Sequence, residues 1–266
     1  MNKNTDAKKE ELEGFTFQED GHKYFFDGKP LTGITTILKV LAKPALIQWA
    51  ANMAVSHLAL VGTPYYGPNN DLIDHYIVNG EQFNEAKVAH RKKKEEAGEI
   101  GTDVHSQIEE IIKSSIKYTG GVVHEIIKIA LNQVESNEQL KHFVDWAIKN
   151  KVKFLVSEVR IYSKEYWLGG TCDFVCEIGK DVWIGDIKTG SGIYPEHFFQ
   201  TAGYQLLFKE MGLYPKIKGH LILNLKKDFS FEEKRSISNE ENRDAFLAAL
   251  KLYRVMEKIN GQVINK

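Results

Sequence analysis

One stretch of the sequence, residues 169–204, constrains the fold more than any other. It is typical of two strands joined by a tight turn at Gly179 and followed by a helix. Each strand carries an aspartate, Asp173 on the first and Asp186 on the second, and the hairpin brings the two acids close together. Neighbouring carboxylates raise one another's pKa, a conflict that a bound divalent cation relieves. The stretch therefore predicts a cation site.

The second strand begins with apolar residues and ends with charged ones. Side chains alternate between the two faces of a strand, so Asp186 and Lys188 lie on the face of Ile184, while Trp183 and Ile187 lie on the other. Buried charges are unfavourable unless they pair or share an ion. A strand that simply runs out into solvent would look the same, and this short pattern taken alone favours that explanation.

The helix that follows is marked at both ends. Pro195 stands at its first position, and Gly212 follows its expected end near Glu210. Gln200 and Tyr204 are four residues apart and so share one face. Taken alone, this is an ordinary amphipathic helix with two polar residues at the edge of a core.

Together, the patterns Gly-x-x-Asp, Asp-x-Lys and Gln-x-x-x-Tyr, in this order, resemble the PD-(D/E)xK nuclease superfamily in its RecB-like exonuclease branch. Phage-type members and the mitochondrial genome maintenance exonuclease are similar. Upstream, the segment 101–105 resembles the histidine motif of the branch, and Glu158 resembles its early acidic motif. The resemblance implies an α/β fold, with the mixed central sheet of the restriction-endonuclease-like core flanked by helices, an N-terminal hairpin and a helical insertion.

The resemblance also implies a metal site. Asp173 and Asp186 would hold Mg²⁺ or Mn²⁺, with the backbone carbonyl of Ile187 completing the site and His105 holding a second ion. Hard oxygen ligands without thiolates favour these ions over zinc. A single histidine on a helix is more often a satisfied edge residue, so His105 depends on the downstream motifs. Glu109, one turn further on, is expected to be a surface acid.

Catalytic and substrate-positioning roles follow from the same resemblance. Lys188 would orient or deprotonate the attacking water and stabilise charge on phosphorus. Cations would lower its pKa and carboxylates would raise it, and the sequence does not decide between them. Glu158 would support the metal site, or alternatively pair with Arg160. Gln200 and Tyr204 would position the DNA strand.

The composition is that of a globular protein. Apolar residues make up 42% and charged residues 27% of the 266 residues, and 35 basic against 36 acidic residues give a net charge of −1. This balance argues against a histone-like coat of positive charge. Cys172 and Cys176 are expected on one face of the Asp173 strand, where they would not easily bridge. Two cysteines cannot hold a four-thiolate cluster, so no iron–sulfur cluster is expected.

No apolar run is long enough to span a membrane, and the mixed-charge residues 1–14, with three glutamates and an aspartate, do not resemble a signal peptide or a mitochondrial presequence. A cytoplasmic location in a bacterial or phage-infected cell is expected. The expected organisation has four parts: a disordered tail at 1–14, a hairpin and helix packed on the core at 15–61, a helical region with the histidine motif at 62–150, and the nuclease core at 151–266.

Within that organisation, residues 62–70 are expected to form a loop and 71–97 a helix, with further helices at 101–118 and 122–134. In the strand expected at 152–161, alternating residues from Val152 to Arg160 are expected on one face.

A basic run near residue 90 is the main candidate for DNA contact. It consists of Arg91, Lys92, Lys93 and Lys94. Such a run is usually a solvated helix face, and the two glutamates that follow it reduce its net positive charge. Its functional interpretation is a contact to the DNA backbone, because phosphates need cations. Residues 70–135 are the candidate cover past which a DNA end would be threaded.

The expected function is Mg²⁺-dependent hydrolysis of DNA from a free end, in recombination, repair or replication of phage or bacterial DNA. Two alternatives stay open: a sequence- or structure-specific endonuclease of the same superfamily, and an inert nucleic-acid-binding module. DNA is the expected partner, single-stranded or with free ends, and recombination or replication proteins are candidates. Polarity, strand preference, RNA cleavage, the number of ions and the oligomeric state are not determined by the sequence.

Overall fold

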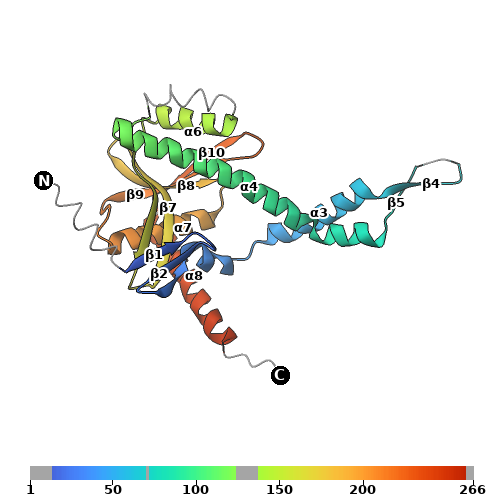
Figure 1. The fold of residues 1–266 in the computed structure, drawn as a ribbon, viewed down its shortest axis with the longest axis horizontal. Coiled ribbons are helices and arrows are strands. Elements are labelled where there is room, and N and C mark those ends of the chain that lie inside the picture. Colours follow the sequence, from blue (N-terminus) through green and yellow to red (C-terminus); the bar gives the residue numbers. More distant parts are fainter. Residues whose placement is uncertain (1–13, 70–71, 124–136, 262–266) are drawn as a thin grey trace. The chain divides into compact units, whose positions relative to one another are not determined.

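The computed structural model describes residues 14–69, 72–123 and 137–261 (Figure 1). The chain divides into two compact units, a larger one formed by residues up to Leu41 together with those from Val104 onward, and a smaller one, Ala42–Asp103. Each unit is described by itself.

The larger unit is built on an eight-stranded sheet, ordered β1-β2-β3-β7-β8-β9-β10, with β6 also paired to β7. Its strands are β1 (Phe15–Gln18), β2 (Lys23–Phe26), β3 (Lys29–Gly33), β6 (Lys153–Ser163), β7 (Leu168–Ile178), β8 (Asp181–Lys188), β9 (Ile217–Leu225) and β10 (Phe231–Ser236). The pairs β3–β7 and β8–β9 are parallel and the others are antiparallel. The expected α/β fold with a mixed sheet is confirmed.

Strand β7 has a gap in its pairing that positions the site. One edge of β7 pairs with β6 along most of its length. The other edge pairs with β3 at Leu168–Gly169 and with β8 at Phe174–Ile178. Residues 170–173 therefore lie between these two partners, at the point where β7 and β8 diverge. Asp173 is the last of them.

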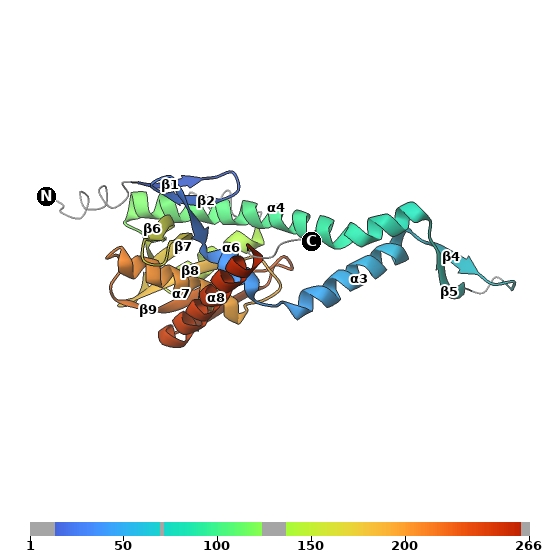
Figure 2. The ribbon, with the colours of Figure 1, turned by 90° about the horizontal axis from the view of Figure 1, so that it is seen from below.

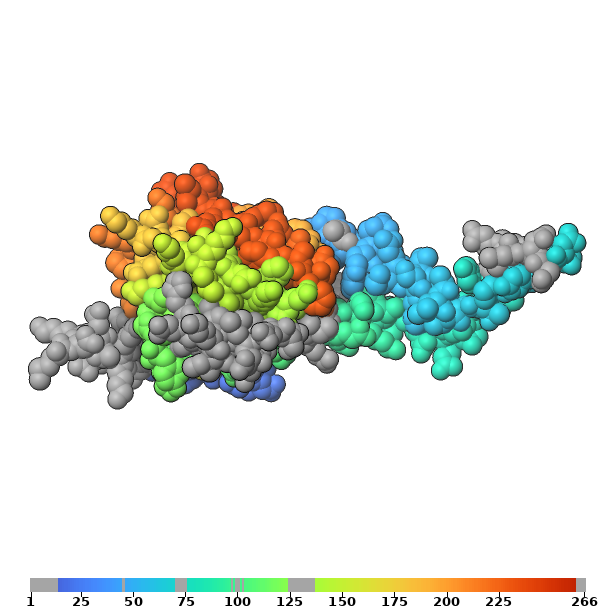
Figure 3. Space-filling view, turned by 90° about the horizontal axis from the view of Figure 1, so that it is seen from above, coloured from blue at the N-terminus to red at the C-terminus, as the bar shows by residue number. Residues whose placement is uncertain are grey.

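Helices cover both faces of the sheet (Figure 2). On one face, α6 (Glu138–Lys149) and the part of α4 (Gly80–Thr119) from Val104 onward pack over Phe154, Phe174 and Trp183. Figure 3 views this side, with α6 in yellow-green outermost. Asn137 caps α6 by accepting from the backbone amides of Gln139 and Leu140, which fixes where the helix begins.

The other face is covered by α7 (Pro195–Glu210) and α8 (Asn239–Asn260), together with α2 (Ile34–Ile37) and the short 3-10 helix η1 (Leu38–Val40). Ile184 packs on this side, whereas Trp183 and Ile187 pack on the opposite side. The alternation expected for β8 is therefore confirmed. The two helix layers enclose the sheet and exclude water from most of its length.

The expected N-terminal hairpin is confirmed as β1 and β2, and its aromatic residues form a small core. Phe15 stacks on Tyr162 with ring centroids 4.8 Å apart, and Tyr24 and Phe26 are buried. Strand β3, which the sequence analysis did not anticipate, joins this hairpin to β7.

The smaller unit contains α3 (Pro44–Val61), β4 (Thr63–Tyr66), β5 (Leu72–Ile77) and the beginning of α4. The expectation of a loop at 62–70 and a helix from 71 is wrong here, because β4 and β5 form an antiparallel hairpin. A capping box starts α4 only at Gly80: Asn79 and Gln82 exchange hydrogen bonds of 2.8 and 2.9 Å between backbone amide and side chain.

Helix α4 continues without a break through Gly98 and Gly101, although the sequence suggested two helices. A helical glycine costs only about 1 kcal/mol, which neighbouring packing can outweigh. The helix expected at 122–134 lies almost wholly outside the described residues. Among the helices that are described, none is long and apolar enough to cross a bilayer.

Two expectations about side-chain faces are wrong. A β-bulge in β6 between Phe154 and Val156 reverses the alternation, so these two residues point to opposite faces. Cys176 packs with the α4 and α6 side, whereas Cys172 packs with the α7 and α8 side. Both cysteines are free and buried.

Candidate active site

A network of buried and half-buried side chains joins the end of β8 to α7. The Lys188 Nζ lies 2.5 Å from the Asp186 Oδ2. The Gln200 amide bridges them, because its Nε2 donates to the Asp186 Oδ1 at 3.0 Å and its Oε1 accepts from Lys188 at 3.3 Å. The same Nε2 lies 2.8 Å from the Tyr204 hydroxyl. Four of the residues selected from the sequence therefore make one connected group.

Burial and charge together set the protonation of this network. Asp186 is fully buried, and burial raises the pKa of its carboxyl, while the Lys188 ammonium opposes this rise. For Lys188, burial lowers the pKa, but the nearby Asp186 and Asp173 carboxylates outweigh it and raise the pKa overall. The sequence did not decide whether the pKa of Lys188 is raised or lowered, and in the folded chain the carboxylates raise it. Without a metal, Lys188 is therefore an ammonium.

Asp173 lies in the gap between β7 and β8. Its Oδ2 accepts a 2.6 Å hydrogen bond from the backbone amide of Ile187, the residue that follows Asp186. The same oxygen lies 3.9 Å from the Nδ1 of His105 on α4. The diverging strands therefore bring the carboxylate of Asp173 to the end of β8 that carries Asp186 and Lys188.

Glu158 is strained and electrostatically frustrated. Its backbone φ is +47°, in the left-handed region that non-glycine residues rarely adopt. Burial, and then the charges of Asp173 and Glu109, raise the pKa of its carboxyl to about 8. The charges of Lys113 and Arg160 lower this pKa but do not outweigh the causes that raise it, and Arg160 forms an ion pair with Glu19 at 3.7 Å.

Glu109 lies closer to the candidate site than the sequence suggested. It is ion-paired with Lys113, its side chain is 28% exposed, and its charge acts on Glu158. The available signal was its position one helical turn after His105, which puts both residues on the same face of α4. It is therefore a half-buried acid whose charge acts on Glu158, rather than a fully exposed surface acid.

The residues present fit a hard divalent cation. No three His, Cys, Asp or Glu side chains within the described ranges gather closely enough to form a ready-made ligand set. Mg²⁺, however, is commonly held by one or two carboxylates and keeps several waters. Asp173 and Asp186 can supply those carboxylates. The raised pKa of Glu158 and the buried Asp186 Oδ2, whose contact is the Lys188 ammonium, indicate excess negative charge that a cation would neutralise.

Glu158 gives a prediction for the pH dependence of stability without metal. Its pKa is about 8 in the folded chain and near the ordinary 4.5 in the unfolded chain. The folded state then binds more protons between these values, so the free energy of unfolding falls as pH rises from about 5 to 8. Glu158→Gln is expected to remove this decline. Thermal melts of the wild-type chain and of Glu158→Gln in EDTA, at about pH 5 and about pH 8, measure this decline. If the variant changed the stability equally at the two pH values, the raised pKa of Glu158 would be contradicted.

The four candidate DNA contacts lie in the smaller unit. Arg91 to Lys94 are exposed on α4, and Lys93 pairs with Glu96 at 3.3 Å. The structure does not place this unit relative to the network described above, so their role stays a prediction.

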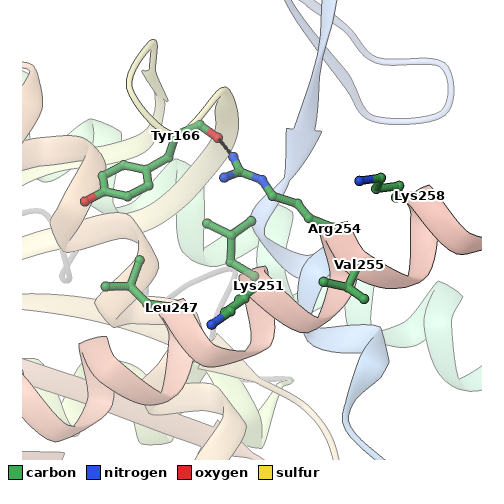
Figure 4. Close-up of a pocket in the computed structure, with 7 residues that line it drawn as sticks. Tyr166, Leu247, Lys251, Arg254, Val255 and Lys258 are labelled. Atoms are coloured by element: carbon green, nitrogen blue, oxygen red, sulfur yellow. Dashed lines mark hydrogen bonds between the residues drawn. The ribbon is translucent and has the colours of Figure 1, made fainter.

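A cavity of about 360 Å³ along α8 belongs to a different part of the larger unit (Figure 4). Lys251, Arg254 and Lys258 surround an apolar floor, and Arg254 donates to the backbone carbonyl of Tyr166. None of the catalytic, metal-binding or DNA-binding residues predicted from the sequence lines this cavity.

Comparison with known proteins gives only distant likenesses. No protein-family model matches the chain, and no curated protein matches it. The alkaline exonuclease LHK-Exo from Laribacter hongkongensis is 11% identical over 88% of this chain and 95% of that chain, with a TM-score of 0.30. Its complex with dAMP gives 12% identity, the same coverage and a TM-score of 0.32. The structure of SSO0001 gives 14% identity over 56% of this chain and 74% of that chain, with a TM-score of 0.27. At such low TM-scores the likenesses carry no argument, and the site rests on its own geometry.

Proposed function

We propose that this chain is a Mg²⁺- or Mn²⁺-dependent deoxyribonuclease of the PD-(D/E)xK type, which hydrolyses phosphodiester bonds from a free DNA end. One observation carries the proposal. The pair of buried Asp186 and half-buried Lys188, joined by Gln200, stands beside the Asp173 carboxylate at the point where two strands diverge. Two acids and an ammonium in so small a space suit the chemistry of a phosphate bound through a cation.

In this proposal, Asp173, Asp186 and the backbone carbonyl of Ile187 hold the ion, with Glu158 supporting the site and His105 serving a second ion. The bound metal would polarise the scissile phosphate and lower the pKa of a water molecule. The hydrogen bond from the Ile187 amide fixes the orientation of Asp173, so one of the two carboxylates is already in place.

Lys188 acts in its charged form. Its raised pKa keeps it an ammonium at neutral pH, which suits stabilisation of the negative charge that builds on the phosphate oxygens. Gln200 holds both Asp186 and Lys188, and Tyr204 anchors Gln200 from the next turn of α7. Gln200 and Tyr204 therefore set the spacing between the Asp186 carboxylate and the Lys188 ammonium. In this proposal the same two residues position the DNA strand.

The direct test is incubation of end-labelled single- and double-stranded linear DNA with the protein in Mg²⁺, in Mn²⁺ and in EDTA. Hydrolysis that needs the cation is expected, and the lengths of the labelled products report direction and processivity. Binding of DNA without cleavage under all conditions would favour the inert nucleic-acid-binding module instead.

Covalently closed circles separate an exonuclease from an endonuclease. We expect closed circular DNA to survive while the same DNA, once linearised, is degraded. Fixed fragments from the closed circle would instead favour the sequence- or structure-specific endonuclease.

The basic run of α4 gives a prediction about affinity. Replacing Arg91 to Lys94 by alanine is expected to weaken DNA binding and to flatten its salt dependence, because each lost phosphate contact removes about 0.9 from the slope of log K against log salt for duplex DNA. Fluorescence anisotropy between 50 and about 200 mM salt measures both. Replacing the exposed Lys216 and Lys218 by alanine serves as the control. Unchanged affinity and slope would remove the run from the DNA-binding surface.

A further inference from the structure

Strand β9 contains two buried polar side chains that lack hydrogen-bond partners within the described residues. Asn224 and His220 are both fully buried. Neither the Oδ1 and Nδ2 of Asn224 nor the two ring nitrogens of His220 make a hydrogen bond there. A buried polar group left unpaired costs about 1–3 kcal/mol, so each of these residues needs a physical explanation.

The strand register separates the two residues. β8 and β9 run parallel, and Lys188 stands beside Asn224, while Asp186 stands beside Ile222 and Ile184 beside His220. Neighbours in register project from the same face of a sheet. Asn224 is therefore on the face of the Asp186–Lys188 pair and beside Lys188 in the register, whereas His220 is four residues away beside Ile184.

The ammonium of Lys188 has room for another acceptor. It carries three N–H donors, and its partners are the Asp186 Oδ2 and the Gln200 Oε1. If a cation binds Asp186, the carboxylate is shared and its hold on Lys188 weakens. On the far side of Asn224, Glu232 is already paired with Lys226 at 3.5 Å and with Lys234 at 2.9 Å. The amide oxygen of Asn224, unpaired within the described residues, is thus the acceptor that strand β9 places beside Lys188 in the register.

We propose that Asn224 is a positioning residue of this site: its Oδ1 receives the Lys188 ammonium when the charge of Asp186 is taken up by a cation or removed. The exchange would keep the ammonium in place for the phosphate when the Asp186 carboxylate serves a cation. Its catalytic consequence rests on the proposed nuclease function, but the exchange itself is a property of the folded chain and is tested without DNA.

The test is a double-mutant cycle in thermal stability, measured on the full chain in EDTA. Asn224→Leu alone is expected to leave the melting temperature unchanged or to raise it, because it removes two unpaired polar atoms. In an Asp186→Asn background the same change is expected to lower the melting temperature by roughly 4 °C or more, since Lys188 then loses its reserve acceptor. Equal shifts in the two backgrounds would overturn the proposal and would indicate a buried water at Asn224.

His220→Leu is the matched control, because it removes a buried unpaired polar side chain from the same strand and face. Its shift is expected to be the same in both backgrounds, and a background-dependent shift as large as that of Asn224→Leu would overturn the proposal. Should Asn224→Leu fail to fold, the double variant Asp186→Asn/Asn224→Asp tests the proposal instead. It places a carboxylate at position 224 and is expected to melt above Asp186→Asn alone, and no gain would overturn the proposal.

The activity of Asn224→Leu supplies a second readout. We expect kcat for DNA hydrolysis to fall about tenfold with KM unchanged within about twofold, because the charge that is misplaced acts on the transition state. A loss confined to KM would overturn the positioning role. Failure of the wild-type chain to cleave any DNA, with the melting cycle as expected, would refute the nuclease function and leave the exchange standing.

Discussion

Lys188→Met is expected to lower the rate of DNA hydrolysis by about 10³-fold or more, with DNA binding largely retained. The ammonium is the positive charge of the β8 network and stands within 2.5 Å of the Asp186 carboxylate. Loss of one preorganised donor to a developing negative charge typically costs about 10²–10³ in kcat. The raised pKa of Lys188 argues that a charge, rather than a neutral base, is lost. Single-turnover hydrolysis of labelled DNA measures the effect.

The same variant carries a stability signature. Removing the ammonium leaves the buried Asp186 without its counter-charge, which is unfavourable. Mg²⁺ is therefore expected to raise the melting temperature of Lys188→Met more than that of the wild-type chain, because the cation replaces the lost charge.

Lys180→Met is the control for both measurements. Lys180 is an exposed residue in the turn between β7 and β8, so its replacement is expected to leave rate and stability unchanged. A Lys188→Met protein that folds and keeps activity within about tenfold of wild type would remove Lys188 from the chemistry.

Gly185→Ala is expected to destabilise the protein by about 3 kcal/mol, toward the upper end of overpacking changes. Gly185 is paired across β7 and β8 with Phe174. A Cβ atom at position 185 would lie 2.0 Å from two ring atoms of Phe174. That ring cannot easily move, because it is fully buried and lies 5.4 Å from the Phe154 ring and 6.3 Å from Trp146. Thermal melts are expected to show a fall of roughly 6–12 °C.

Two further variants give the cause of that loss. Gly190→Ala has no atom within 4 Å of the added Cβ and is expected to be close to neutral. Phe174→Leu in the Gly185→Ala background removes the clashing ring edge and is expected to recover part of the stability. A Gly185→Ala protein as stable as wild type would show that the aromatic ring does not pack over this glycine in solution.

Several local features followed from the sequence because they depend on nearby residues. Proline and glycine at its two ends defined α7, and the alternation along Val182–Lys188 put Asp186 and Lys188 on one face. Helix periodicity likewise put Gln200 and Tyr204 on one face of α7, where both meet the network. These are short-range steric and periodic rules that hold with little tertiary context.

The remaining features depended on distant partners. The bulge in β6 and the pairing of β3 with β7 depend on contacts of β7 with strands far away in the chain, and the left-handed φ of Glu158 lies within the paired part of β6. Propensity likewise did not reveal β4 and β5, since their strand state depends on pairing with one another.

The sequence by itself determined the chemical inventory at the ends of two adjoining strands: two aspartates, a lysine and a glutamine–tyrosine pair at fixed spacings. Only the tertiary structure decided the charge of Lys188, the effect of the Glu109 charge on Glu158, and the position of Asn224 of β9 beside Lys188. The reason is physical. Burial and electrostatic interaction depend on distances between residues remote in the chain, and those distances are fixed only when the sheet and its helices have packed.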